Sequence, residues 1–193
     1  MLTLKIRDII FKNPIMVASG TYGYGDEVSD FVNLSKFGAI ITKSVTRNPR
    51  EGNPPPRIFE VSSGMLNSIG LANLGVEKYI EEKIPYLNKI DTNIIINIAG
   101  TRIDDYVETL EMLEGADSKH IGYEINISCP NVKEGGMQFG VSPDMTRELT
   151  QELRKRTDKI LIMKLSPNVT SIEEIGLASQ DGGADAVSAI NTV

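Results

Sequence analysis

Two hydrophobic patterns follow one another along the chain. Near the start, Leu2, Leu4 and Ile6 alternate with polar residues, and residues 9–11 form a second apolar segment after a polar break, which predicts a small N-terminal β-hairpin. From residue 15 onward, short apolar runs rich in Ile and Val alternate with longer stretches whose apolar residues recur at helical spacing. We expect the runs to be strands, at 15–18, 39–42, 94–98, 122–127, 160–163 and 186–190.

Helix signals mark the stretches between these runs. The start signals are Asp26, Asp104, proline at the first helical position in Ser142-Pro143, and a capping box made by Ser171 and Glu174. Gly38 and Gly182-Gly183 stand where helix C-caps are expected. Continuous apolar strands imply burial on both faces, and helical connections between them imply parallel neighbours, so the fold class is α/β.

Polar residues gather at or just after the C-terminal ends of the expected strands. They are Ser19-Gly20, Lys43-Ser44, Asn97, Asn126 with Ser128-Cys129, Lys164 and Asn191-Thr192. A doubly wound sheet would spread the outer ones apart, whereas a TIM (β/α)8 barrel brings them together at one mouth. We therefore predict a single barrel domain over residues 1–193. Because such a barrel takes ~250 residues, about six of its eight units should be present and the C-terminal units missing.

Composition narrows the function classes. The 193 residues are 40% hydrophobic and 24% charged, which is typical of a folded globular domain. A net charge of −6 without a Lys/Arg cluster argues against a nucleic-acid partner, and no apolar stretch approaches the roughly 20 residues that span a membrane. One cysteine permits no internal disulfide, which fits a cytoplasmic location.

Common catalytic motifs are missing. The chain has no GxGxxG, P-loop, HExxH or spaced Cys/His ligands, so we expect no metal site. His120 precedes the 122–127 run, at the end opposite to the polar residues, and we expect a structural or solvated role rather than a place in a Ser-His-Asp triad.

Cys129 has two interpretations. A free cysteine is most often a small buried hydrophobe. Cys129 instead leaves a strand for a loop that contains Pro130, Gly135, Gly136 and Gly140, the kind of segment in which functional residues concentrate. A thiol with a pKa of about 8.5 in its free form could serve there as a base or a nucleophile.

Two lysines and several amides suggest a ligand. Lys43 and Lys164 each end an apolar run, where a lysine can also simply extend to solvent. Together with Asn67, Asn126, Asn131 and Asn191 they would suit a planar ligand that carries carboxylate and imide groups, or an electron-rich cofactor ring. The glycines of residues 19–23 and 63–71 would let such a flat ligand approach the backbone, although turn formation explains them equally well.

The segments together resemble the dihydroorotate dehydrogenases, from residue 15 to 193. The matching motifs are Ala18-Ser19-Gly20-Thr21-Tyr22-Gly23, Thr42-Lys43-Ser44-Val45-Thr46, Gly52-Asn53-Pro54-Pro55-Pro56-Arg57, Asn67-Ser68-Ile69-Gly70-Leu71 and Asn126-Ile127-Ser128-Cys129-Pro130-Asn131. Cysteine rather than serine at 129 resembles class 1, and the continuation through residues 132–140 is similar to the catalytic FMN subunit of class 1B.

The resemblance implies a role for each motif. Cys129 would remove the C5 proton of dihydroorotate while the C6 hydride passes to FMN. The substrate would be held by Lys43, Asn67, Ser68, Ile69, Gly70, Leu71, Asn126, Asn131, Asn191 and Thr192. The cofactor would be held by Ser19, Gly20, Lys43, Ser44, Asn97, Asn126 and Lys164, with the charge of Lys164 stabilising the reduced ring.

The class 1B resemblance also implies partners. A homodimer would join an electron-transfer subunit carrying FAD and a [2Fe-2S] cluster to form a heterotetramer, with NAD as the final acceptor. This chain lacks the cysteines for a cluster of its own. Because the family's FMN phosphate site lies in the loops after strands 7 and 8, a chain without those units should bind FMN poorly.

Two alternatives to this function stay open. A Schiff-base aldolase on the same barrel would use Lys164 as its nucleophile, which requires the lysine to be desolvated and neutral. A non-catalytic barrel fragment would only offer a surface to another molecule.

Overall fold

The computed structural model of the chain describes residues 2–128 and 139–192. It begins with the expected hairpin, in which β1 (Leu4–Ile6) pairs antiparallel with β2 (Ile9–Phe11) and Ile6 lies opposite Ile9. The two-residue turn places Arg7 at a φ of 51°. Phe11 is fully buried, so the hairpin packs against the body of the protein through its second strand.

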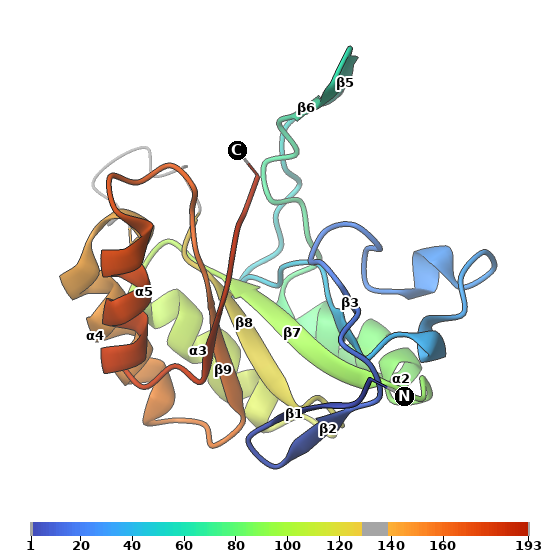
Figure 1. Ribbon diagram of the computed structural model, residues 1–193. Helices are drawn as coiled ribbons and strands as arrows, with labels where there is room; N and C mark the ends of the chain where they lie inside the picture. Colours follow the sequence, from blue (N-terminus) through green and yellow to red (C-terminus); the bar gives the residue numbers. More distant parts are fainter. Residues whose placement is uncertain (1, 129–138, 193) are drawn as a thin grey trace.

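Six parallel strands form the central sheet (Figure 1). They are β3 (Met16–Val17), β4 (Ala39–Ile41), β7 (Asn93–Ala99), β8 (Gly122–Asn126), β9 (Ile160–Lys164) and β10 (Ala186–Ser188). Each strand pairs with the one that precedes it in this series. A doubly wound sheet needs a reversal of strand order, and this sheet has none. The curled, consecutive arrangement is that of a TIM (β/α)8 barrel, and the described residues supply six of its eight strands.

Helices cover the outer face of the sheet (Figure 1). They are α1 (Val76–Lys78), a π-helical turn (Tyr79–Lys83), α2 (Ile84–Leu87), α3 (Ile103–Glu114), α4 (Pro143–Arg154) and α5 (Ile172–Asp181). Ser142 and Ser171 cap the last two, because each side chain accepts a hydrogen bond from the backbone three residues later. Both serines are confirmed as N-caps and Gly182 as a C-cap, whereas the capping box predicted for Ser171 is present only in the bond that Ser171 accepts.

The prediction of a helix after Asp26 is wrong. The structure has two short 3-10 turns instead, η1 (Asp26–Val28) and η2 (Leu34–Lys36). Gly25 enters the first turn at a φ of 101°, and the Asp26 carboxylate binds Lys83 Nζ at 2.6 Å rather than capping a helix. Phe31 is 87% exposed, so it supplies no buried helical face.

A second hairpin was not predicted. β5 (Ile58–Val61) pairs antiparallel with β6 (Gly64–Asn67), and the pair projects from the C-terminal end of the sheet (Figure 1). All eight of its residues are exposed, including Phe59 at 70% and Leu66 at 64%. The hairpin therefore contributes little to the core.

The two faces of the sheet bury different residues. The outer face packs against the helices, with Ile96, Tyr123 and Met163 among its fully buried side chains. The inner face begins as an apolar layer at the N-terminal ends of the strands, closed from below by the first hairpin. That layer consists of Phe11, Ala39, Ile41, Ile95, Ile160 and Ile162. The inner face then becomes polar toward the C-terminal ends of the strands.

Candidate functional site

A polar layer fills the inner face of the sheet above the apolar one. Asn97 of β7 lies directly opposite Glu124 of β8, and Lys164 of β9 lies opposite Ser188 of β10. Alternate residues of a strand point to the same face, so Asn97 follows the inward Ile95 and Lys164 follows the inward Ile162. Asn97 is fully buried and Glu124 is 2% exposed.

Hydrogen bonds tie this layer together across three strands and one loop, and an ion pair adds a fourth strand. Ser44 Oγ donates to Asn97 Oδ1 at 2.5 Å, and Asn97 Nδ2 donates to Glu124 Oε1 at 2.6 Å. Ser188 Oγ donates to Glu124 Oε2 at 2.8 Å. Lys164 Nζ lies 3.6 Å from Glu124 Oε1, and its side chain is 11% exposed. Because the buried carboxylate has both neutral donors and a cation, its desolvation is compensated.

Amides lie beside Lys164 at the rim of this layer. Asn126 ends β8, and its Oδ1 accepts from Asn191 Nδ2 at 3.1 Å and from the Ser128 backbone at 3.2 Å. The backbone N–H of Thr192 donates to Asn191 Oδ1 at 2.8 Å. The structure thus joins Asn126 and Asn191, which are 65 residues apart in the sequence.

The loops after the first two parallel strands complete the same end of the sheet. The Lys43 backbone N–H donates to Gly23 O at 2.9 Å, which links the loop after β4 to the one after β3. Lys43 and Ser19 are half-buried. Gly20 has a φ of 84°, and a side chain there would meet no atom within 4 Å, so its backbone faces open space.

The segment 67–71 lies apart from this polar layer. Asn67 is the exposed last residue of β6, and the Ser68 backbone is tied to Arg57 O and to Asn53 Nδ2 within its own loop. Ile69 and Gly70 also contact Asn53, and Leu71 holds a φ of 59°. Within the described residues, no hydrogen bond joins the segment to the asparagines of the rim.

Cys129 and Asn131 lie outside the described residues. The chain on either side of residues 129–138 is placed at the rim. Ser128 Oγ donates to Lys164 O at 3.3 Å, and the Gly140 backbone donates to Ile127 O at 3.1 Å. The described residues on both sides of this segment therefore lie beside the polar layer.

Glu124 and Ser188 belong to the polar layer, but neither was predicted from the sequence as a site residue. Glu124 stands two residues before Asn126, so the two share a face of the strand, and it is a charged residue inside an otherwise apolar run. Such a residue almost always has a buried partner, and that was the available signal. Ser188 had no comparable signal, because a serine near a strand end is common.

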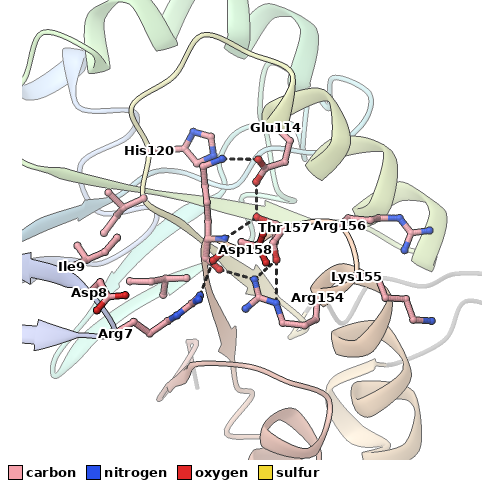
Figure 2. A pocket seen from close by; sticks show the side chains of 13 residues that line it. Arg7, Asp8, Ile9, Glu114, His120, Arg154, Lys155, Arg156, Thr157 and Asp158 are labelled. Atoms are coloured by element: carbon pink, nitrogen blue, oxygen red, sulfur yellow. Dashed lines mark hydrogen bonds and ion pairs between the residues drawn. The ribbon is translucent and has the colours of Figure 1, made fainter.

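A separate cavity of about 660 Å³ lies at the opposite end of the sheet, between the first hairpin and the chain that leads into β9 (Figure 2). Its cations already have partners. Arg154 pairs with Asp185 at 2.9 Å, Lys159 with Glu114 at 2.5 Å, and Arg156 with Glu111 at 3.0 Å. The cavity is thus lined by a satisfied structural network and lies far from the rim amides.

His120 belongs to this network. Tyr123 Oη donates to Glu114 Oε1 at 2.9 Å, so His120 Nε2 donates to Tyr123 Oη at 2.7 Å and Nδ1 accepts from Ser118 Oγ at 2.9 Å. A neutral ring with its proton on Nε2 satisfies all of these partners. Burial, with a smaller contribution from Lys159, lowers the pKa of His120 to about 4. The structural role expected for this histidine is confirmed.

Stability should depend on pH through His120. Its pKa is about 4 when folded and 6.5 in its reference state, so the unfolded chain takes up the proton first as pH falls. The contribution is complete above pH 6.5 and is lost progressively down to about pH 4, by up to about 3 kcal/mol. Urea unfolding of the complete protein at pH 7 and pH 5 measures it. His120→Gln should flatten the dependence in that window, and equal slopes in the two proteins would contradict the assignment.

Two kinds of feature are absent from the described residues. Residues 2–128 and 139–192 contain no group of three or more His, Cys, Asp or Glu side chains that could hold a metal ion. Over the same ranges, no helix is both long and apolar enough to cross a membrane.

Comparison with known proteins identifies the family. The model of the family described as "Dihydroorotate dehydrogenase" matches residues 1–193. The chain is 50% identical over 192 residues to the "Dihydroorotate dehydrogenase B (NAD(+)), catalytic subunit" of Bacteroides thetaiotaomicron, covering 100% of this chain and 63% of that protein. Proteins of the same name from Thermoanaerobacter pseudethanolicus and Alkaliphilus oremlandii are 47% identical over 194 residues and 52% identical over 188 residues. The matched regions cover 63% and 62% of those two proteins, and 100% and 97% of this chain. The chain spans less than two thirds of these relatives, and it belongs to the dihydroorotate dehydrogenase family.

Proposed function

We propose that the complete protein oxidises dihydroorotate to orotate in pyrimidine biosynthesis, as the FMN-binding catalytic subunit of a class 1B enzyme in the cytoplasm. The observation that carries the proposal is the joined polar layer and rim at one end of the sheet: Asn97 and Glu124 below, and Lys164 with Asn126 and Asn191 at the rim. The names of the relatives supply the reaction. Residues 1–193 would form part of one barrel domain.

The donor set at the mouth fits a flavin. Lys164 supplies a largely buried ammonium, which suits the electron-rich edge of a reduced ring. Asn126 Oδ1 is occupied by two donors, and within the described residues its Nδ2 has no acceptor, so that group can donate to a ligand. The open space over Gly20 lets a flat ring approach the backbone. Ser19, Lys43, Ser44 and Asn97 complete the proposed cofactor contacts.

In the proposed mechanism, this chain binds the substrate, orients it and removes one proton. The substrate contacts are Lys43, Asn67, Ser68, Ile69, Gly70, Leu71, Asn126, Asn131, Asn191 and Thr192. The Cys129 thiolate takes the C5 proton, while FMN supplies an acceptor for the hydride from C6. Asn126 and Asn191 hold each other at 3.1 Å, so two amides are fixed before the substrate arrives, which favours the reactive orientation.

The partner subunit belongs to the same proposal. The relatives are named catalytic subunits and NAD-linked, which supports a second subunit that carries electrons away. We assign FAD and a [2Fe-2S] cluster to that subunit, with NAD as acceptor. The catalytic chains would form a homodimer within a heterotetramer.

The aldolase alternative finds less support. An amine nucleophile must be neutral. Lys164 Nζ instead lies 3.6 Å from the buried carboxylate of Glu124, and a buried carboxylate favours a charged ammonium partner. Trapping of a carbonyl substrate on Lys164 by borohydride, in a protein without a flavin, would favour the aldolase.

The visible spectrum of the complete, purified protein tests the function. We expect flavin absorption near its usual visible maximum and loss of that absorption when dihydroorotate is added without oxygen. The reason is the transfer of two electrons to the bound ring. A protein that carries flavin, is bleached by dithionite and is unaffected by dihydroorotate would overturn the proposal. A protein without flavin would favour the non-catalytic alternative.

A further inference from the structure

Glu124 occupies a position that the proposed mechanism does not use. It is a carboxylate, 2% exposed, in the centre of the inner face of the sheet. Burying such a group is costly unless donors and cations compensate for it. Both of its oxygens are held by neutral donors, Oε1 by Asn97 at 2.6 Å and Oε2 by Ser188 at 2.8 Å. The carboxylate is therefore fixed in place without help from a cation.

Lys164 is the nearest cation to Glu124, and its N–H groups stay available as hydrogen-bond donors. Its Nζ lies 3.6 Å from Glu124 Oε1, close enough for charge attraction and too far for a hydrogen bond. The three ammonium protons are thus not taken up by Glu124 and can reach a ligand.

Strand register places the lysine nearer the mouth than the carboxylate. Lys164 lies opposite Asn126 at the rim, whereas Glu124 lies opposite Ile162, which belongs to the apolar layer. A ligand that enters from the mouth would meet Lys164 first. Glu124 can then influence that ligand only from behind the lysine.

We propose that Glu124 is a positioning residue that holds the Lys164 ammonium toward the cofactor and offsets its charge, and thereby sets the reduction potential of the flavin. The inference rests on the proposed function and deepens it. Reduction adds negative charge to the ring, so a nearby carboxylate opposes reduction and an uncompensated ammonium favours it. Asn97, itself held by Ser44, donates to the same Oε1 that Lys164 approaches, which fixes the position of that oxygen.

The test is Glu124→Gln in the complete, flavin-loaded enzyme. Glutamine keeps the shape but carries no charge. Its oxygen can still accept from Asn97, and its NH2 group can donate to the Ser188 hydroxyl oxygen. We expect the flavin to become at least tenfold easier to reduce, a rise of about 30 mV for a two-electron couple. A spectroscopic redox titration against a reference dye measures this without any turnover. An unchanged potential in a folded, yellow variant would overturn the proposal.

Two further comparisons isolate the route through Lys164. Glu114→Gln makes the same chemical change at the opposite end of the sheet, where Glu114 pairs with Lys159, and it should leave the potential unchanged. In a double-mutant cycle with Lys164→Gln, the two shifts should not add, because each residue acts on the other. Strictly additive shifts would show that Glu124 does not act through Lys164 and would overturn its positioning role.

A second variant tests the same proposal if Glu124→Gln does not fold. Glu124→Asp keeps the charge but draws it back from Lys164 by one methylene, so we expect a smaller rise in potential, and no rise would count against the proposal. The outcomes also separate the two proposals. Flavin that is not reduced by dihydroorotate overturns the function alone, an unchanged potential overturns the role of Glu124 alone, and absence of flavin from the complete enzyme overturns both.

Discussion

Cys129→Ala in the complete enzyme should lower the rate of flavin reduction by dihydroorotate by about 10² to 10⁴ at neutral pH, the usual contribution of a positioned base. The thiolate is the proposed acceptor of the C5 proton, and alanine offers none. Flavin should stay bound, because the polar layer of Asn97, Glu124 and Lys164 is unchanged. Stopped-flow bleaching of the flavin, with the rate followed across pH, measures the effect.

Two controls sharpen this experiment. Reduction of the same variant by dithionite should be normal, which would show that the flavin itself is intact. Raising the pH should increase the rate of flavin reduction in the parent enzyme, because its thiol ionises. The variant should show no such increase. A variant that reduces within a factor of a few of the parent would remove Cys129 from the role of base.

Gly122→Ala should destabilise the protein by about 3 kcal/mol or more, or prevent folding. Gly122 starts β8 opposite Ile160 of β9. A Cβ there would lie 2.5 Å from the Ile160 carbonyl oxygen and 2.8 Å from its Cβ, and the first of these is backbone held in the sheet. The two strands would have to separate at the layer that supports the polar site. Chemical denaturation of the complete protein measures the loss.

Gly115→Ala is the matched control. Gly115 follows α3 with an ordinary helical φ of −76°, and the nearest atoms to an added Cβ are 3.7 Å away. The substitution should leave the free energy of unfolding nearly unchanged or raise it by up to about 1 kcal/mol, because alanine lowers the conformational entropy of the unfolded chain. Similar losses at Gly115 and Gly122 would show that the steric argument is wrong.

Sequence pattern was informative where burial is continuous. The strands β7, β8 and β9 are covered on both faces, so each appears as a mainly apolar run, and their predicted bounds agree with the structure to within one residue. The barrel topology followed from polar residues at the strand ends, because parallel strands in sequential order bring those ends together. The joined Asn126 and Asn191 side chains bear out that spatial expectation.

Other features could not be predicted from local pattern. The exposed hairpin of β5 and β6 carries Phe59 and Leu66 without burying them, so hydrophobicity gave no guide to its place. The turn at Asp26 depends on Lys83, 57 residues away. The pairing of Glu124 with Lys164 likewise depends on register between two strands, which one sequence does not reveal. The roles of Cys129 and Asn131 stay predictions.

The first hairpin has a consequence for the order of folding. Arg7, at the tip of its turn, donates to Asp158 O at 2.7 Å and lies 3.5 Å from the carboxylate of Asp185. The residue that anchors the start of the chain thus finds its partners only after more than 150 further residues. During synthesis the hairpin emerges first, yet it can dock only when the segment leading into β10 has left the ribosome. The floor of the barrel should therefore be among the last parts of this chain to become protected from hydrogen exchange.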